Sequence, residues 1–96
     1  MSPSSEPTAV APGTVEVAVV LPAHLHARPA GQVVRTAAGF ASTVEIVFGA
    51  KAANARGVLG LLALGAVAGT TVQVRAAGPD AQAAADAVAA VLAAAE

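Results

Sequence analysis

The sequence predicts an α+β fold, an open-faced two-layer sandwich of element order βαββαβα in which three helices cover one face of an antiparallel four-stranded sheet. Short β-branched segments alternate along the chain with longer segments that carry apolar residues at the helical period. Strands and helices mixed in this order favour a sheet with its helices on one side. The 96 residues suffice for one domain near the lower limit of a self-sufficient core.

The first strand and the first helix are expected on either side of a short loop. Residues 15–20 are β-branched and partly alternate, which predicts a strand, and residues 21–25 form the loop that leads to His26. A helix should then run from about residue 27 to residue 38 and end at Gly39. The side of this helix that faces the core consists of Ala30, Val33, Val34 and Ala37.

The middle of the chain predicts a hairpin followed by a short helix. Residues 43–48 form the second strand, and a glycine turns the chain into a third strand at residues 50–53. The inner side of the second strand carries Val44, Ile46 and Phe48. A helix follows at residues 56–64. Gly57 and Gly60 each cost it about 1 kcal/mol relative to alanine, so it should be the least stable of the three helices.

The last strand and the last helix complete the pattern. Residues 70–76 predict the fourth strand, and Pro79 suits the first position of a final helix whose dipole Asp80 complements. The buried side of this helix should consist of Ala84, Val88, Val91, Leu92 and Ala95. The face of the sheet without helices should be open to solvent and carry Glu16, Glu45, Gln73 and Arg75.

Composition argues against several classes of function. A net charge of −1 and only two aromatic residues disfavour a nucleic-acid partner, because such proteins use basic surfaces and aromatic rings. Without cysteine, the chain has no disulfide and no thiolate metal site. No apolar run is long enough for a membrane helix. Residues 1–13 lack the features of a signal peptide and are expected to form a disordered arm before a domain at residues 14–96.

The sequence His26-Ala27-Arg28-Pro29 places an imidazole where the first helix begins and a guanidinium two residues later. The first N–H groups of a helix have no partner within it and carry the positive end of the helix dipole, so they bind anions. Pro29 fits the first turn because it lacks a donor. A ring nitrogen of His26 can carry a phosphoryl group, and Arg28 can pair with the phosphoryl oxygens. The motif therefore predicts a phosphate cradle that includes the helix amides of Ala27 and Arg28.

On these residues the sequence resembles the family of HPr, the histidine-containing phosphocarrier protein of the bacterial phosphoenolpyruvate–sugar phosphotransferase system. Residues 25–30, Leu-His-Ala-Arg-Pro-Ala, resemble the active-site signature of the family. Residues 54–65 resemble its second-helix region, and the element order is the same. The likeness extends over about residues 15–95.

The resemblance implies that His26 accepts a phosphoryl group on Nδ1 from the phosphohistidine of Enzyme I and passes it to sugar-specific enzyme IIA proteins, while Arg28 holds the phosphoryl oxygens. The chain would be a substrate and donor for these enzymes and not itself an enzyme. We expect a cytoplasmic monomer without a cofactor. Both partners would contact the start of the first helix and the exposed apolar side of the second, at Ala27, Ala30, Val58, Leu59 and Leu62. For the last three residues, the alternative is an ordinary place in the core.

The chain departs from the family pattern at two positions. Many family members from low-GC Gram-positive bacteria carry a regulatory serine at the start of the second helix, where this chain has Gly57. Phosphorylation by the dedicated kinase should therefore be absent at this position. His24 stands where the family usually has a small residue. His24 and His26 could together bind a metal through two imidazoles, but no carboxylate lies nearby in sequence, so we expect His24 to tune the electrostatics of His26 instead.

Two other functions remain open at this point. The chain could be a regulatory module of the same fold, in which phosphorylation of His26 only changes the affinity of a partner. It could also be an independent enzyme, but no carboxylate pair, glycine-rich nucleotide loop or Ser/His/Asp set supports that reading.

Overall fold

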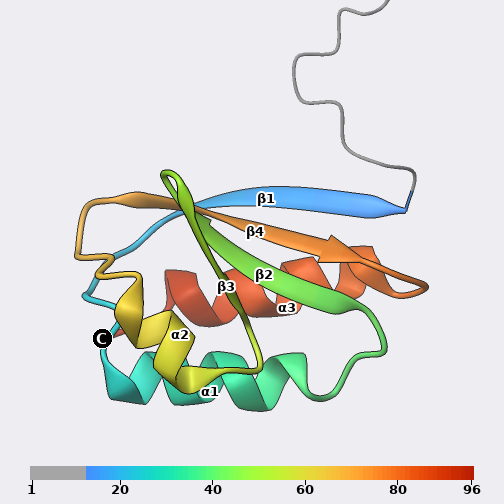
Figure 1. Ribbon diagram of the computed structural model, residues 1–96, viewed down its shortest axis with the longest axis horizontal. Coiled ribbons are helices and arrows are strands. Elements are labelled where there is room, and N and C mark those ends of the chain that lie inside the picture. Colours follow the sequence, from blue (N-terminus) through green and yellow to red (C-terminus); the bar gives the residue numbers. More distant parts are fainter. Residues whose placement is uncertain (1–12) are drawn as a thin grey trace, which may run out of the picture.

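The computed structural model describes residues 13–96, so the arm expected at residues 1–13 lies outside the described residues except for Gly13. The elements follow the predicted order: β1 (Thr14–Val20), α1 (Ala27–Ala37), β2 (Thr43–Phe48), β3 (Lys51–Asn54), α2 (Val58–Ala63), β4 (Thr71–Ala77) and α3 (Ala81–Ala93). Figure 1 shows the strands in one layer and the helices together on one side of it. The predicted open-faced sandwich is confirmed.

The sheet is antiparallel throughout and has the order β1-β4-β2-β3. Strand β4 lies between β1 and β2 and pairs with both, with Arg75 facing Glu16 on one side and Glu45 on the other. Strands β1 and β3 are therefore the two edges. This order places the loop after β1 and the loop before β4 at the same end of the molecule, where α1 also begins (Figure 1).

The core lies between the inner face of the sheet and the helices. Strands β2 and β4 alternate between buried and more exposed residues, as the two-residue period of a strand requires. Their buried side chains are Val44, Ile46, Val72, Val74 and Ala76. The predicted apolar sides of α1 and α3 face the same core, although Val34 and Val91 are only partly buried. Helices α1 and α3 contact each other, and alanines make up much of the buried side of both helices, so little side-chain bulk separates them.

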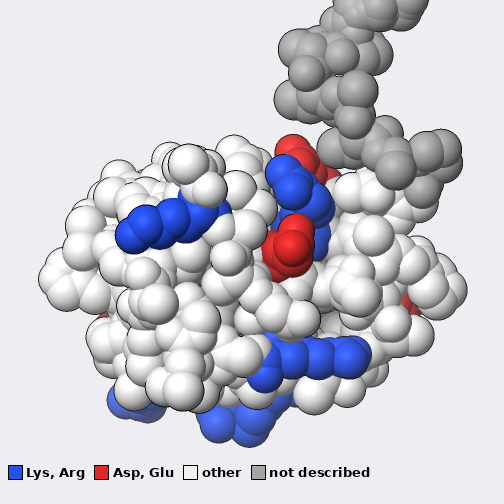
Figure 2. Space-filling view, in the orientation of Figure 1, with Lys and Arg blue, Asp and Glu red and all other residues white. Residues whose placement is uncertain are grey.

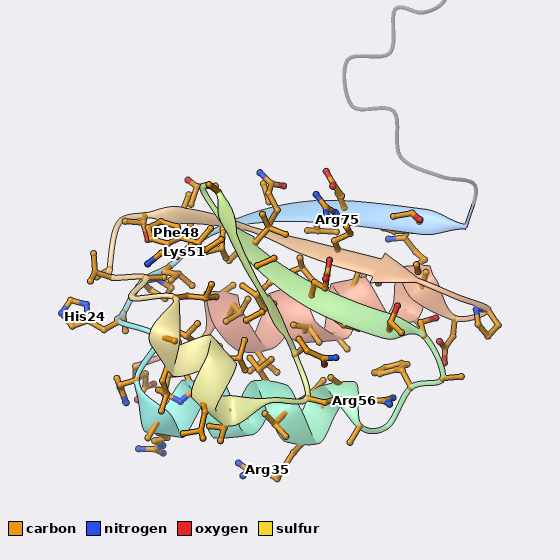
Figure 3. All side chains as sticks on the ribbon, viewed as in Figure 1. His24, Arg35, Phe48, Lys51, Arg56 and Arg75 are labelled. Carbon is orange, nitrogen blue, oxygen red and sulfur yellow. The ribbon has the colours of Figure 1, made fainter. Side chains whose placement is uncertain are left out.

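The open face of the sheet carries the charged residues predicted for it. The Nε of Arg75 lies 2.7 Å from a carboxylate oxygen of Glu16, and its Nη1 lies 3.7 Å from one of Glu45. Figure 2 shows acidic and basic atoms meeting over the sheet, at the position that Figure 3 labels Arg75. These side chains are partly exposed, so each pair contributes at most about 1 kcal/mol.

Two helix starts differ from the prediction. Helix α2 begins at Val58 instead of residue 56, because the side chain of Asn54 accepts the N–H of Arg56 at 2.8 Å and Gly57 is extended, with φ −116° and ψ 103°. Pro79 lies before α3 and not at its first position, which Ala81 occupies after the cap residue Asp80. In both places, a turn precedes the helix, so the helix begins at a later residue than the sequence pattern predicted.

A partly buried hydrogen-bonded cluster joins the start of β2 to the start of α3 at the other end of α1. The carboxylate of Asp80 accepts the N–H of Ala41 at 3.0 Å and the N–H of Ser42 at 2.8 Å. It also accepts the hydroxyl of Ser42 at 2.5 Å, while that hydroxyl oxygen accepts the N–H of Asp80 at 3.0 Å. Ser42 is only 1% exposed. These bonds lower the pKa of Asp80, and the side chain of Ser42 has the largest effect.

None of the helices within residues 13–96 combines the length and the apolar character needed to cross a membrane.

Candidate functional site

His26 is the cap residue of α1, and its side chain faces the first turn of that helix. Its backbone is extended, with φ −89° and ψ −170°, and its ring Nδ1 accepts the N–H of Arg28. The N···N distance of 3.4 Å is longer than an ordinary hydrogen bond, so the bond is weak. His26 is exposed. The structure thus places an accessible ring nitrogen directly over the amides at the start of a helix.

The amides of this first turn remain largely free to bind another group. Within the part of the chain that the structure describes, the N–H of Ala27 has no hydrogen-bond partner, and that of Arg28 has only the weak bond to His26. Pro29 has no N–H to offer. The helical bonds begin with Ala30, whose N–H donates to the carbonyl of His26 at 3.0 Å. Two amides at the positive end of the α1 dipole can therefore bind an anion.

The other ring nitrogen of His26 contacts the end of the described chain. Its Nε2 lies 3.1 Å from the backbone oxygen of Glu96, and Figure 1 shows that end beside the start of α1. Because Nδ1 accepts a hydrogen bond, the proton of the neutral ring lies on Nε2, which donates it to Glu96. This tautomer leaves the lone pair of Nδ1 as the nucleophile. Sequence reasoning missed Glu96, because the contact uses a backbone atom 70 residues away and no side-chain pattern signals it.

Arg28 is exposed beside a small hollow at the same end of α1. The hollow has a volume of about 130 Å³ and is lined by Arg28, Pro29, Gln32, Ala94 and Glu96. Among residues 13–96, the guanidinium of Arg28 has no ion pair, so its donors are available to an anion. The structure brings together the predicted His26, Ala27 and Arg28.

His24 is exposed, and its ring is bonded to the loop between α2 and β4. Its Nδ1 accepts the N–H of Ala68 at 3.0 Å. No group of three or more possible metal ligands occurs within residues 13–96. Because one ring nitrogen of His24 is bonded to the backbone and no third ligand is near, the described residues do not assemble the metal site considered from the sequence.

The predicted partner surface is exposed on α2 but not at every position on α1. Val58, Leu59 and Leu62 are 38%, 79% and 37% exposed, whereas Leu61 is fully buried. Helix α2 thus packs on the core through Leu61 and leaves an apolar ridge, made of Val58, Leu59 and Leu62, in solvent. Ala27 is exposed, but Ala30 is fully buried. The expectation that Ala30 contacts a partner is wrong, because its place on the helical period turns it into the core.

Gly57 is the cap residue of α2, and no side chain caps this helix. The position therefore offers no hydroxyl to a kinase. A Cβ added at Gly57 would lie 3.6 Å from the carbonyl oxygen of Asn54, an ordinary contact distance. Packing would therefore allow a side chain at residue 57, and it does not explain why this chain has glycine instead of serine there.

Comparison with known proteins places this geometry in a family. The protein-family model described as "PTS HPr component phosphorylation site" matches residues 14–94. The chain is 41% identical over 81 residues to a multiphosphoryl transfer protein of Xanthomonas campestris pv. campestris, a match that covers 79% of this chain and 10% of that relative. The chain therefore spans about a tenth of that protein's length.

Two further relatives match over most of their own length. The phosphocarrier protein HPr of Lysinibacillus sphaericus is 37% identical over 79 residues, which cover 82% of this chain and 90% of the relative. The crystal structure of an HPr from Bacillus anthracis str. Ames has a TM-score of 0.76 and 31% identity, covering 82% of this chain and 96% of that one. The predicted resemblance is confirmed, and the chain belongs to the HPr family of phosphocarrier components of the phosphotransferase system.

Proposed function

We propose that this chain is a phosphocarrier in which Nδ1 of His26 accepts a phosphoryl group from the phosphohistidine of Enzyme I and donates it to enzyme IIA proteins. The observation that carries the proposal is the position of Nδ1 at the start of α1, where its lone pair accepts only a weak bond from the N–H of Arg28 and the N–H of Ala27 beside it has no partner among the described residues. Membership of the HPr family supports the same reading. A phosphoryl group on Nδ1 would accept the N–H groups of Ala27 and Arg28 in place of the weak bond that His26 now makes.

The transfer needs no cofactor and no net proton movement. As Nδ1 attacks phosphorus, the P–N bond of the donor breaks, and its electron pair returns to the donor imidazole. The proton on Nε2 of His26 stays in place, so the ring becomes positively charged next to the dianionic phosphoryl group. The backbone oxygen of Glu96 stabilises this charge through its contact with Nε2. In the second transfer, a nucleophile of the enzyme IIA protein attacks phosphorus. The bond between phosphorus and Nδ1 of His26 then breaks, and its electron pair returns to Nδ1.

Arg28 and the ridge on α2 have separate roles in this proposal. Arg28 holds the phosphoryl oxygens, while Val58, Leu59 and Leu62 form the apolar centre of the surface that Enzyme I and enzyme IIA contact. Figure 2 shows basic side chains along the lower edge of the molecule, where α1 lies and where Figure 3 labels Arg35. Acidic partner surfaces would complement this edge. The partner aligns donor and acceptor, and this chain supplies the nucleophile and the anion site.

The test is incubation of the chain with Enzyme I and phosphoenolpyruvate. We expect one acid-labile phosphate per chain, lost in His26→Ala with little change in stability because His26 is exposed. An unchanged phosphate yield in that variant would overturn the assignment of His26. Deletion of this chain alone from cells should abolish uptake of a sugar. A change in transcription without loss of uptake would favour the regulatory module.

A further inference from the structure

His24 takes part in two hydrogen bonds that together connect His26 to a distant loop. The carbonyl of His24 accepts the N–H of His26 at 2.9 Å, which closes a three-residue turn centred on Leu25. The ring Nδ1 of His24 accepts the N–H of Ala68 at 3.0 Å. We call the second bond the His24 bridge. Figure 3 shows His24 where the loop before α1 meets the loop between α2 and β4.

The same pair of loops is joined by a second bond next to the His24 bridge. The N–H of Leu25 donates to the carbonyl of Ala66 at 3.0 Å, and the side chain of Leu25 is buried. The loop between α2 and β4 has no regular structure of its own, and it reverses direction at Gly65 and Gly69, whose φ angles are +69° and +87°. Two further bonds join the same loops, because the N–H of Gly69 donates to the carbonyl of Leu21 at 2.8 Å and the N–H of Leu21 donates to the carbonyl of Thr70 at 2.9 Å. The position of the loop at His26 therefore depends on all of these hydrogen bonds and on the buried side chains of Leu25 and Ala66.

On the helix side, little fixes the direction of the His26 ring. The bond from the N–H of Arg28 is weak at 3.4 Å, and the ring is exposed. The direction of Nδ1 therefore depends on the contact of Nε2 with the backbone oxygen of Glu96 at 3.1 Å and on the backbone of His26, which the turn through His24 sets. From these contacts we propose that His24 is a positioning residue, which holds Nδ1 of His26 in line for phosphoryl transfer through the bond from Ala68. This inference rests on the proposed phosphocarrier function.

The His24 bridge also separates the roles of the two imidazoles. Because Nδ1 of His24 accepts an amide proton at 3.0 Å, its lone pair is used, and the proton of the neutral ring lies on Nε2. His24 therefore presents no free nucleophile. Its Nδ1 makes a full-strength bond where that of His26 makes a weak one, so the phosphoryl group should be accepted at His26 alone.

The test compares three substitutions that keep or remove the acceptor. In His24→Asn, the side-chain oxygen is bonded to Cγ as Nδ1 is in histidine and can accept the N–H of Ala68. In His24→Gln, the polar atoms lie one bond further out, where Nε2 lies. In His24→Ala, no acceptor remains. We expect kcat for phosphoryl acceptance from Enzyme I to fall about tenfold in the Ala and Gln variants, since a 1 Å misplacement of a reacting group can cost about a hundredfold. His24→Asn should restore most of the rate.

A merely structural role would change other quantities. KM for Enzyme I should stay within about twofold in every variant, because the ridge of Val58, Leu59 and Leu62 is untouched. Equal rates in wild type and His24→Ala, or equal rates in the Asn and Gln variants, would overturn the inference. If His24→Ala does not fold, exchange of the Ala68 amide in the wild type tests the bridge, since slow exchange supports it and exchange at the rate of a free amide contradicts it.

The experiment also distinguishes this inference from the proposed function. A wild-type chain that takes up no phosphate would overturn the phosphocarrier proposal. NMR would still test the bridge in that case, because the Arg28 amide and the His26 ring nitrogens should shift in His24→Ala and return toward their wild-type values in His24→Asn. Absence of these shifts would overturn the role of His24 alone.

Discussion

The two ends of α1 differ in whether their terminal backbone groups are hydrogen-bonded. At the N-terminal end, the amides of Ala27 and Arg28 have no partner or only a weak one within residues 13–96. At the C-terminal end, the guanidinium of Arg56 donates to the carbonyls of Ala37 and Phe40. Every helix end leaves such groups unpaired until something outside the helix bonds them. Here the described residues bond one end and leave the amides of the other available to an anion, which the proposed function makes a phosphoryl group.

The bonded end continues beyond α1 into the cluster of Ser42 and Asp80. There the chain after α1 is held to the start of α3 by four hydrogen bonds between residues 38 or 39 positions apart. The N-terminal end of α1, which we call the open end, combines exposed side chains with backbone N–H groups that are free or weakly bonded among the described residues. Substitutions at the bonded end should therefore change stability and leave phosphorylation intact, whereas substitutions at the open end should do the reverse.

Gly78→Ala should have the largest effect on stability. Gly78 has a φ of +142°, and an added Cβ would lie 2.6 Å from the hydroxyl oxygen of Ser42 and 2.8 Å from its Cα. Backbone strain and overpacking should together lower the free energy of unfolding by about 3–5 kcal/mol. Urea unfolding measures the change. The folded fraction should still accept phosphate, and a loss of less than 1 kcal/mol would contradict the close packing at this end.

Arg28→Ala should have the largest effect at the open end. Charge-assisted hydrogen bonds contribute about 1.5–3 kcal/mol, so the phosphorylated state should become about ten to a hundred times less favoured relative to phospho-Enzyme I. The ratio of phosphoenolpyruvate to pyruvate at half phosphorylation measures this shift. Arg35→Ala is the control, because Arg35 is also an exposed arginine of α1 but lies nearer its other end. Equal shifts in both variants would mean that general charge, and not the Arg28 contact, holds the phosphoryl group.

Ser42→Ala should lower stability at neutral pH by about 1–2 kcal/mol, because the buried side chain of Ser42 supplies the acceptor for the partly buried amide of Asp80. The pH dependence has a definite sign. The pKa of Asp80 is lowered on folding, chiefly by the Ser42 hydroxyl and then by the N–H of Ala41. Its contribution is therefore present above the unfolded pKa of about 3.9 and is lost as pH falls toward the lower folded value.

Since the variant removes the main cause of this lowering, its stability should fall less steeply between neutral pH and strong acid. The difference from wild type should shrink below about pH 4. Urea unfolding at a series of pH values measures both curves. Parallel curves would contradict the role given to the Ser42 hydroxyl.

The comparison of the two ends also explains which features the sequence could predict. The elements and their order follow from local patterns, since the β-branched run at residues 43–48 and the apolar period of α1 need no distant partner. The open end of α1 was predictable for the same reason, because the motif at residues 26–29 lies within one helix start. Local patterns therefore sufficed to place His26, Ala27 and Arg28 at the start of α1.

The contacts that complete each end were not predictable from local patterns. Glu96 lies 70 positions from His26, Ala68 lies 44 from His24, and Asp80 lies 38 from Ser42. Each contact forms only when the sheet brings distant loops together, and two of the three involve a backbone atom that carries no sequence signal. The start of α2 was predicted too early, because the turn at Asn54 competes with the helix.

Gly57→Ser should have the smallest effect and tests a third helix end. Helix α2 has no side-chain cap, and a Cβ at Gly57 meets only the carbonyl oxygen of Asn54, at 3.6 Å. A serine hydroxyl can accept a first-turn amide of α2, so the free energy of unfolding should rise by a few tenths of a kcal/mol. Gly57→Ala lacks the hydroxyl and serves as the control. A serine variant no more stable than the alanine variant would show that the start of α2 gains nothing from a cap.

Incubation with a kinase that phosphorylates HPr on serine should label Gly57→Ser but not the wild type at this position. Phosphate on residue 57 of the wild type would contradict the expectation drawn from the missing hydroxyl.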